Sequence, residues 1–143
     1  MNPVSAALIT LVLLAASITD LRNRVVPNRL TLGAALGGLA LAGVRGLPEF
    51  ATALAAASVV SAPLMVISLL RPAGLGMGDV KLVAVLGLFL GWEALAALLA
   101  GCLLAGLAGV LLSLVARRSP SEVVLPLVPF LTLGTLPVIV SAL

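Results

Sequence analysis

Long, nearly uninterrupted apolar runs are the feature that most limits what this chain can fold into. Short polar stretches separate runs at 3–18, 30–44, 50–70, 82–90, 94–116 and 123–143. Apolar residues make up 62% of the chain and charged residues only 9%, whereas an average soluble domain is about 25% charged. Eight basic and five acidic side chains cannot coat a soluble globule of 143 residues. The composition therefore excludes a soluble fold, disorder and a fibre, and it predicts an integral membrane protein.

The lengths of the runs predict an all-α protein with about six transmembrane helices in one compact domain, residues 1–143. A spanning helix needs about 20 apolar residues, so six spans take roughly 120 residues and leave room only for short loops. The fourth run is short, so its helix either begins near Gly78 or is re-entrant. Prolines 126, 129 and 137 predict a bend or local unwinding near the start of the last helix. Two glycine pairs, 33 with 37 and 87 with 91, have the spacing of close helix packing.

The basic residues predict the orientation of the bundle. With six spans, the stretches after the first, third and fifth helices share one side of the membrane. That side holds seven basic residues, namely Arg22, Arg24, Arg29, Arg71, Lys81, Arg117 and Arg118, and the other side holds Arg45 alone. Excess Lys and Arg marks the cytoplasmic side, so both termini are expected on the non-cytoplasmic side. No basic residue precedes the first run, so we expect a span there and not a cleaved signal peptide. The small basic clusters indicate topology, with no nucleic acid partner expected.

The chain contains only two aspartates, Asp20 and Asp79, and they mark the candidate site. An ionisable group at membrane depth is costly, which makes it a functional candidate. Asp20 follows the first run and Asp79 precedes the fourth, so both are expected at the cytoplasmic ends of helices. The chain has no histidine and a single cysteine, Cys102, inside an apolar run. A zinc site and histidine-based catalysis are therefore excluded, and no metal ion or organic cofactor is expected.

Two neighbouring carboxylates suit the hydrolysis of an amide bond. Such a pair shares one proton, so one member can take a proton from water while the other donates a hydrogen bond to a carbonyl oxygen. Gly76 and Gly78 stand just before Asp79 and would let the backbone of an extended substrate approach. The alternative interpretations stay open: either aspartate alone can be a helix cap, and Lys81 can be a side chain that only reaches the interface.

Three segments resemble the prepilin peptidase family of intramembrane aspartyl proteases. The segment from Gly76 to Leu82, Gly-Met-Gly-Asp-Val-Lys-Leu, matches its Gly-x-Gly-Asp-x-Lys signature. Asp20-Leu21-Arg22, followed by Val26-Pro27-Asn28, is similar to the family's first-aspartate region. Pro126, Pro129-Phe130-Leu131 and Gly134 resemble its Pro-rich final segment, with Val128 where the family often has glycine.

The resemblance implies a catalytic pair of Asp20 and Asp79, with Gly76, Gly78 and Lys81 in a loop at the substrate. It implies a protein of the inner membrane that removes the leader of type IV prepilin-like or pseudopilin precursors at the cytoplasmic face. Larger family members carry a zinc-binding region with paired cysteines and methylate the new terminus. This chain starts in its first apolar run and has no cysteine pair, so the resemblance implies the short form without methylation. Nothing in the sequence indicates an oligomeric state.

Two other functions fit parts of the same pattern. Carboxylates in the membrane also serve as proton relays, so a small proton-coupled transporter is one alternative. It predicts acids near the bilayer midplane, whereas both aspartates are expected at helix ends. A non-catalytic pilus or secretion assembly factor on the same fold is the other alternative, and an altered Gly-x-Gly-Asp motif would indicate it. The motif is intact here, which favours the peptidase.

Overall fold

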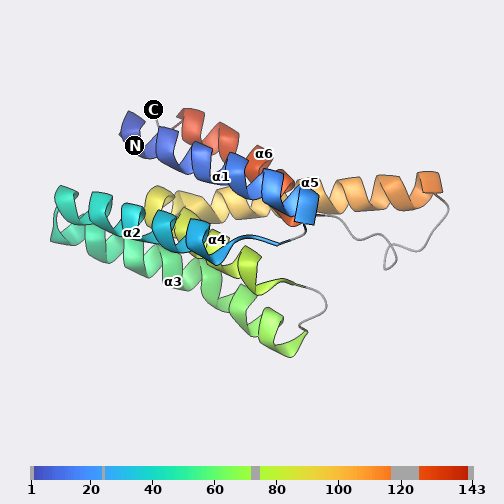
Figure 1. Ribbon diagram of the computed structural model, residues 1–143, viewed down its shortest axis with the longest axis horizontal. Coiled ribbons are helices and arrows are strands. Elements are labelled where there is room, and N and C mark those ends of the chain that lie inside the picture. Colours follow the sequence, from blue (N-terminus) through green and yellow to red (C-terminus); the bar gives the residue numbers. More distant parts are fainter. Residues whose placement is uncertain (1, 24, 72–74, 117–125, 142–143) are drawn as a thin grey trace.

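In the part of the chain that it describes, the structure is a bundle of six α-helices (Figure 1). The computed structural model describes residues 2–23, 25–71, 75–116 and 126–141. The helices are α1 (Pro3–Asn23), α2 (Asn28–Arg45), α3 (Leu47–Leu70), α4 (Met77–Leu90), α5 (Glu93–Ala116) and α6 (Leu127–Ser141). Each predicted run corresponds to one helix, in the predicted order, so the all-α class is confirmed.

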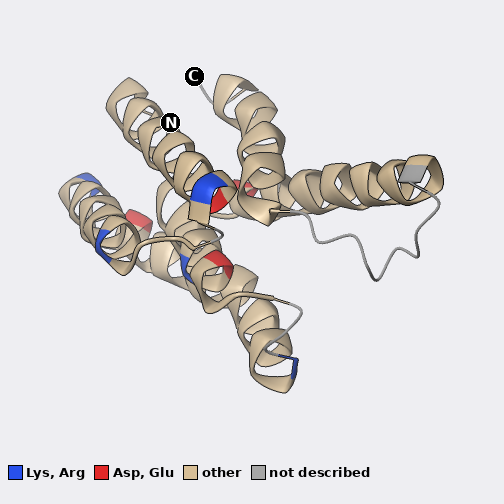
Figure 2. Ribbon diagram, turned by 45° about the vertical axis from the view of Figure 1, so that its right-hand side comes forward, with Lys and Arg blue, Asp and Glu red and all other residues tan. Residues whose placement is uncertain are grey.

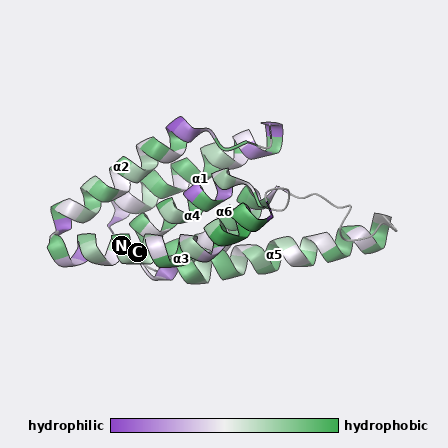
Figure 3. Cartoon of the chain, turned by 90° about the horizontal axis from the view of Figure 1, so that it is seen from below, coloured by the Kyte–Doolittle hydropathy of each residue, from purple (hydrophilic) through white to green (hydrophobic). Residues whose placement is uncertain are grey.

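Among the described residues, three helices are long and apolar enough to cross a membrane, namely α1, α3 and α5. Hydrophobic residues lie along much of each helix (Figure 3), and many of the large ones are exposed. On α5, for example, Leu103 is 74% exposed and Val115 is 83% exposed. Apolar surface on this scale suits contact with lipid. The six-span topology and the side on which the termini lie stay predictions.

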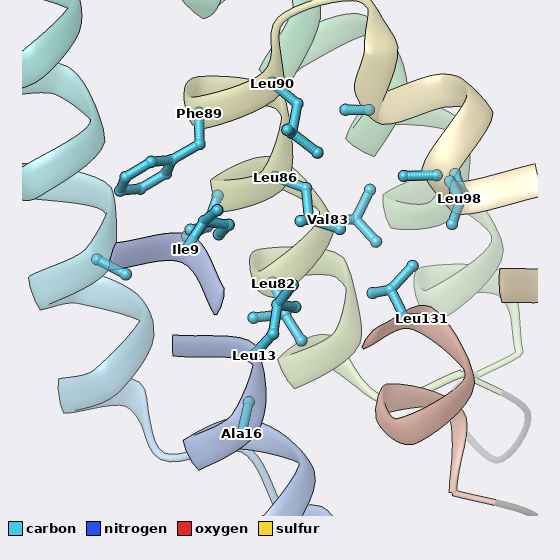
Figure 4. Packing of buried hydrophobic residues seen from close by; sticks show 14 of the residues in the cluster. Ile9, Leu13, Ala16, Leu82, Val83, Leu86, Phe89, Leu90, Leu98 and Leu131 are labelled. Carbon is cyan, nitrogen blue, oxygen red and sulfur yellow. The ribbon is translucent and has the colours of Figure 1, made fainter. Parts of the chain in front are cut away.

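Helix α4 is the central element of the bundle. It contacts each of the other five helices, and Leu82, Val83 and Leu86 have almost no exposed surface. Figure 4 shows Ile9 and Leu13 of α1 pointing toward these side chains. A helix that is apolar all round is buried on all sides. Protein surrounds most of α4, which explains why the fourth run is apolar. The helix is about 21 Å long at 1.5 Å per residue.

Two helix pairs approach so closely that their backbones are in contact. A Cβ atom at Gly87 of α4 would overlap the backbone of Ala57 on α3. A Cβ atom at Gly134 of α6 would likewise overlap the backbone of Gly101 on α5. The predicted packing role of Gly87 is thus confirmed, and the α5–α6 contact shows a close crossing that the spacing rule did not identify.

The predicted role in helix packing is wrong for Gly33, Gly37 and Gly91. Nothing lies within 4 Å of a Cβ atom built at Gly33 or Gly37. The neighbouring Gly38 is the residue of α2 that packs closely, because its Cβ would lie 3.0 Å from the ring of Phe89. Gly91 has φ of 60° and follows the last residue of α4. Its function is therefore to form the turn into α5, since few other residues adopt that φ.

At both aspartates, the end of the helix differs from the end of the apolar run that predicted it. Helix α1 continues past Ile18 to Asn23, which places Asp20 in its last turn. Helix α4 begins at Met77, which places Asp79 in its first turn. Hydropathy marks where apolar residues stop, but polar residues can extend a helix, and Arg22 in the last turn of α1 suits the helix dipole. The last helix begins at Leu127, and the predicted start at 123–125 lies outside the described residues.

The helices run up and down the bundle in sequence. The start of α1 and the end of α6 lie at the end of the molecule that also holds the α2–α3 and α4–α5 turns (Figure 1). The charged residues lie near helix ends (Figure 2). The opposite end holds Asp20 and Asp79 on α1 and α4, together with the described basic residues Arg22, Arg29, Arg71 and Lys81. Arg24, Arg117 and Arg118 lie outside the described residues.

Candidate active site

Asp20 is a buried carboxylate between α1 and α6. It is only 7% exposed, and its Oδ2 accepts a hydrogen bond of 3.3 Å from the backbone N–H of Val128. Val128 is the second residue of α6, where backbone N–H groups have no partner within the helix. Sequence reasoning missed this contact, since it noted Val128 only as a departure from glycine. The bond uses the backbone, so a glycine at this position would form it equally well.

Asp79 lies in the polar first turn of α4, ahead of the apolar run 82–90. Its side chain is partly buried, and its backbone N–H donates a hydrogen bond of 3.1 Å to the carbonyl of Gly76. Asp79 therefore lies where the segment before α4 turns into the helix.

One cavity of about 420 Å³ brings all five predicted site residues together. Its lining includes Asp20 from α1, Gly76 just before α4, and Gly78, Asp79 and Lys81 from α4. The rest of the lining comes from residues 25–28, which lead from α1 into α2, and from Met77. The cavity is therefore built from the segments that follow one aspartate and precede the other.

Two contacts hold the segment between α1 and α2 against the start of α4. A Cβ atom at Gly78 would lie 3.2 Å from Cβ of Val26, a tight contact, and Val26 is buried. The Nζ of Lys81 donates a hydrogen bond of 2.9 Å to Oδ1 of Asn28. Val26 and Asn28 entered the sequence analysis only as part of a resemblance. The tight contact shows why a glycine precedes Asp79 directly: it allows the two segments to meet.

Gly76 has a different environment from Gly78. Its backbone is extended, with φ of −70° and ψ of 141°, a conformation open to any residue. A Cβ atom there would lie 3.5 Å from Oδ2 of Asp79, an ordinary contact distance. Leu75 directly precedes Gly76, and its carbonyl accepts a hydrogen bond of 2.9 Å from the buried Ser68. Gly76 thus lines the cavity next to the Asp79 carboxylate without bringing a side chain into it.

A second cavity, of about 470 Å³, lies at the opposite end of the bundle. It is lined by Arg45, Glu49, Trp92 and Glu93 among others, and by neither aspartate. Although it is the larger of the two and also holds two carboxylates, those of Glu49 and Glu93, it contains none of the five predicted site residues. Within the described ranges, no group of three or more His, Cys, Asp or Glu residues could hold a metal ion.

Comparisons with known proteins agree with the resemblance. The model of the type IV leader peptidase family matches residues 7–114, a range that includes Asp20 and Asp79. The prepilin leader peptidase/N-methyltransferase of Burkholderia pseudomallei (strain 1026b) is 38% identical over 133 residues, which cover 85% of this chain and 41% of the relative. That of Aeromonas hydrophila is 33% identical over 136 residues, covering 91% and 47%. The chain thus spans less than half the length of these curated relatives. No solved structure matches it significantly.

Proposed function

The chain belongs to the type IV leader peptidase family, and on that premise we propose that it is a membrane-embedded aspartic endopeptidase. It removes the leader peptide from type IV prepilin-like precursors, with Asp20 and Asp79 as the catalytic pair. The observation that carries this proposal is the single cavity lined by the only two aspartates of the chain. Their placement in one cavity, on two helices far apart in sequence, supports a mechanism in which the two carboxylates share a proton.

The two carboxylates divide the work by sharing one proton. The ionised member takes a proton from water, and the resulting hydroxide attacks the scissile carbonyl while the protonated member donates its proton to the carbonyl oxygen. When the C–N bond breaks, the first member passes its new proton to the leaving amine and the oxygen returns its proton to the second member. No covalent intermediate forms.

The lining of the cavity suits an extended peptide. Pro27 and Gly76 both have extended backbone conformations on its wall, and Gly76 presents no side chain. A substrate strand can therefore approach the backbone of the segment that carries Asp79, in the way that strand addition works elsewhere. The leader junction of a precursor whose apolar helix lies in the bilayer would reach this depth.

The same proposal includes the topology. All six helices cross the inner membrane, the cavity faces the cytoplasm, and both termini lie on the other side. Support comes from the charges, because Arg22, Arg29, Arg71 and Lys81 lie at the end of the bundle that holds the aspartates, while Arg45 lies at the other end. Basic residues favour the cytoplasmic side.

The proposed activity is tested by co-expressing the chain with a candidate prepilin and measuring loss of the leader by mass spectrometry. We expect cleavage by the wild type and none by the double variant Asp20→Asn/Asp79→Asn. Glu93→Gln, at the opposite cavity, is the matched control for loss of one carboxylate and should cleave normally. Equal cleavage by the double variant and the wild type would overturn the proposal.

A further inference from the structure

A buried hydrogen bond joins α1 and α6 one turn away from Asp20. Oγ of Ser17 and Oγ1 of Thr132 lie 2.7 Å apart, and both side chains are less than a tenth exposed. Ser17 precedes Asp20 by three residues, so the two share one face of α1. Thr132 follows Val128 by four residues, so these two share one face of α6. The hydroxyl pair and the Asp20–Val128 contact therefore link the same two helices, one turn apart.

The hydroxyl of Thr132 also contacts the residue that binds Asp20. Its Oγ1 donates a hydrogen bond of 2.9 Å to the carbonyl of Val128, which leaves it able to accept a bond from Ser17. Val128 is thus held at its carbonyl by Thr132, while its N–H is directed at the carboxylate. Its neighbour Pro129 has no N–H and cannot replace this donor.

The Asp20–Val128 bond is sensitive to the position of α6. At 3.3 Å between nitrogen and oxygen, it lies just beyond the usual range of about 2.7–3.2 Å. A small shift of α6 away from α1 would therefore break it and free the carboxylate to rotate. The Ser17–Thr132 bond opposes such a shift, because it connects the two helices at the next turn.

We infer that Ser17 and Thr132 are positioning residues for Asp20: their hydrogen bond holds the start of α6 against α1, so that the Val128 N–H keeps the Asp20 carboxylate directed toward Asp79. This inference rests on the proposed function of the two aspartates. A purely structural role is the competing explanation, since buried hydroxyl pairs also hold membrane helices together. That role predicts a loss of stability with an unchanged kcat.

The test uses the full chain in proteoliposomes with a prepilin substrate, and it measures kcat, KM and the melting temperature. Thr132→Val keeps the shape of the side chain and removes its hydroxyl, so we expect kcat to fall by about tenfold or more through misplacement of Asp20, with KM within about twofold. Thr132→Ser retains the hydroxyl and should retain kcat. Thr135→Val is the matched control, because Thr135 is a buried threonine of α6 and, among the described residues, its hydroxyl bonds only within that helix, to the carbonyl of Thr132.

The outcomes separate this inference from the proposed function. If Thr132→Val cleaves at the wild-type kcat, or if Thr135→Val loses as much kcat, the positioning role is overturned while the proposed function stands. If Asp20→Asn and Asp79→Asn both cleave normally in the same assay, the proposed function fails and this inference fails with it. Should Thr132→Val not accumulate in membranes, Ser17→Ala decides from the α1 side: a fall in kcat supports the inference, and a normal kcat overturns it.

Discussion

Asp20 and Asp79 line the same cavity but have different surroundings. Asp20 is buried beside the first turn of α6 and accepts a backbone hydrogen bond from it. Asp79 is only partly buried in the first turn of α4, where it lines the cavity together with Gly76 and Lys81. The two carboxylates thus face one cavity from different surroundings, and a backbone N–H orients only that of Asp20 among the contacts described.

The two glycines before Asp79 are predicted to respond differently to a methyl group. Gly78→Ala forces Val26 to move, because the new Cβ would lie 3.2 Å from that side chain; we expect a lower melting temperature and a loss of about 1–3 kcal/mol. Gly76→Ala meets only ordinary contacts and should leave the melting temperature unchanged, but it should raise KM because Gly76 lines the cavity. Thermal unfolding in detergent and cleavage kinetics check both. An unchanged KM for Gly76→Ala, or an unchanged melting temperature for Gly78→Ala, would count against this division.

At the level of the helices, α4 determines the architecture. Its neighbours pack on it from all sides, and α3 does so with direct backbone contact at Gly87. The first turn of α4 carries Asp79 and receives the segment that follows Asp20, through Gly78 and Lys81. Helix packing and site assembly therefore depend on the same short element, and a change that displaces α4 would disturb both.

A matched pair of glycine substitutions tests the packing of α4. Gly87→Ala would place a Cβ against the backbone of Ala57, which cannot rotate away, so we expect a loss of about 1–3 kcal/mol or more. Gly33→Ala on α2 meets nothing within 4 Å, and it should be neutral or stabilise the helix by about 0.5–1 kcal/mol. Thermal unfolding of the purified variants measures both. Equal stability of the two variants would show that the α3–α4 contact is looser than described.

Hydropathy predicted the number and order of the helices because burial in lipid or protein selects apolar residues throughout each one. It did not predict the ends that place the aspartates, since the extension of α1 to Asn23 depends on hydrogen bonding and not on polarity. Glycine spacing identified Gly87 but failed for Gly33 and Gly37, because it cannot tell which face of α2 meets a neighbour.

The candidate site was predictable in part. The rarity of aspartate in an apolar chain marked Asp20 and Asp79, and the Gly-x-Gly-Asp pattern marked the segment beside Asp79. The contact between Asp20 and Val128 was not predictable, because it joins residues 108 positions apart through a backbone N–H that any residue except proline would supply. Such contacts depend on how α1 and α6 pack, and no residue type signals them.

On the scale of the whole molecule, charge and helix direction agree. Alternating helices bring the ends of α1 and α3 and the start of α4 to one end of the bundle, together with both aspartates (Figure 1). Arg45 and the acids Glu49 and Glu93 lie at the opposite end, around the second cavity. This separation of charge is the basis of the proposed orientation, in which the end that carries both aspartates faces the cytoplasm.

The six-span topology predicts that the two ends of α2 lie on opposite sides of the membrane. Cys102 is the only cysteine and is exposed, so Cys102→Ala provides a background without a thiol. In that background we expect the exposed Arg29→Cys to react with an impermeant maleimide from the cytoplasmic side only. Leu47→Cys, at a position 83% exposed, should react from the other side only. Reaction of both from one side would contradict the topology.

The central claim is that Asp20 and Asp79 act together, and the most direct test is the rate of leader cleavage by the two single variants. Purified wild type, Asp20→Asn and Asp79→Asn are compared in proteoliposomes on one prepilin, with melting temperatures to confirm folding. Asparagine keeps the size of each side chain but can neither accept nor share the proton, so we expect each variant to lose at least about 10³-fold in kcat. A folded single variant that cleaves at the wild-type rate would contradict the account.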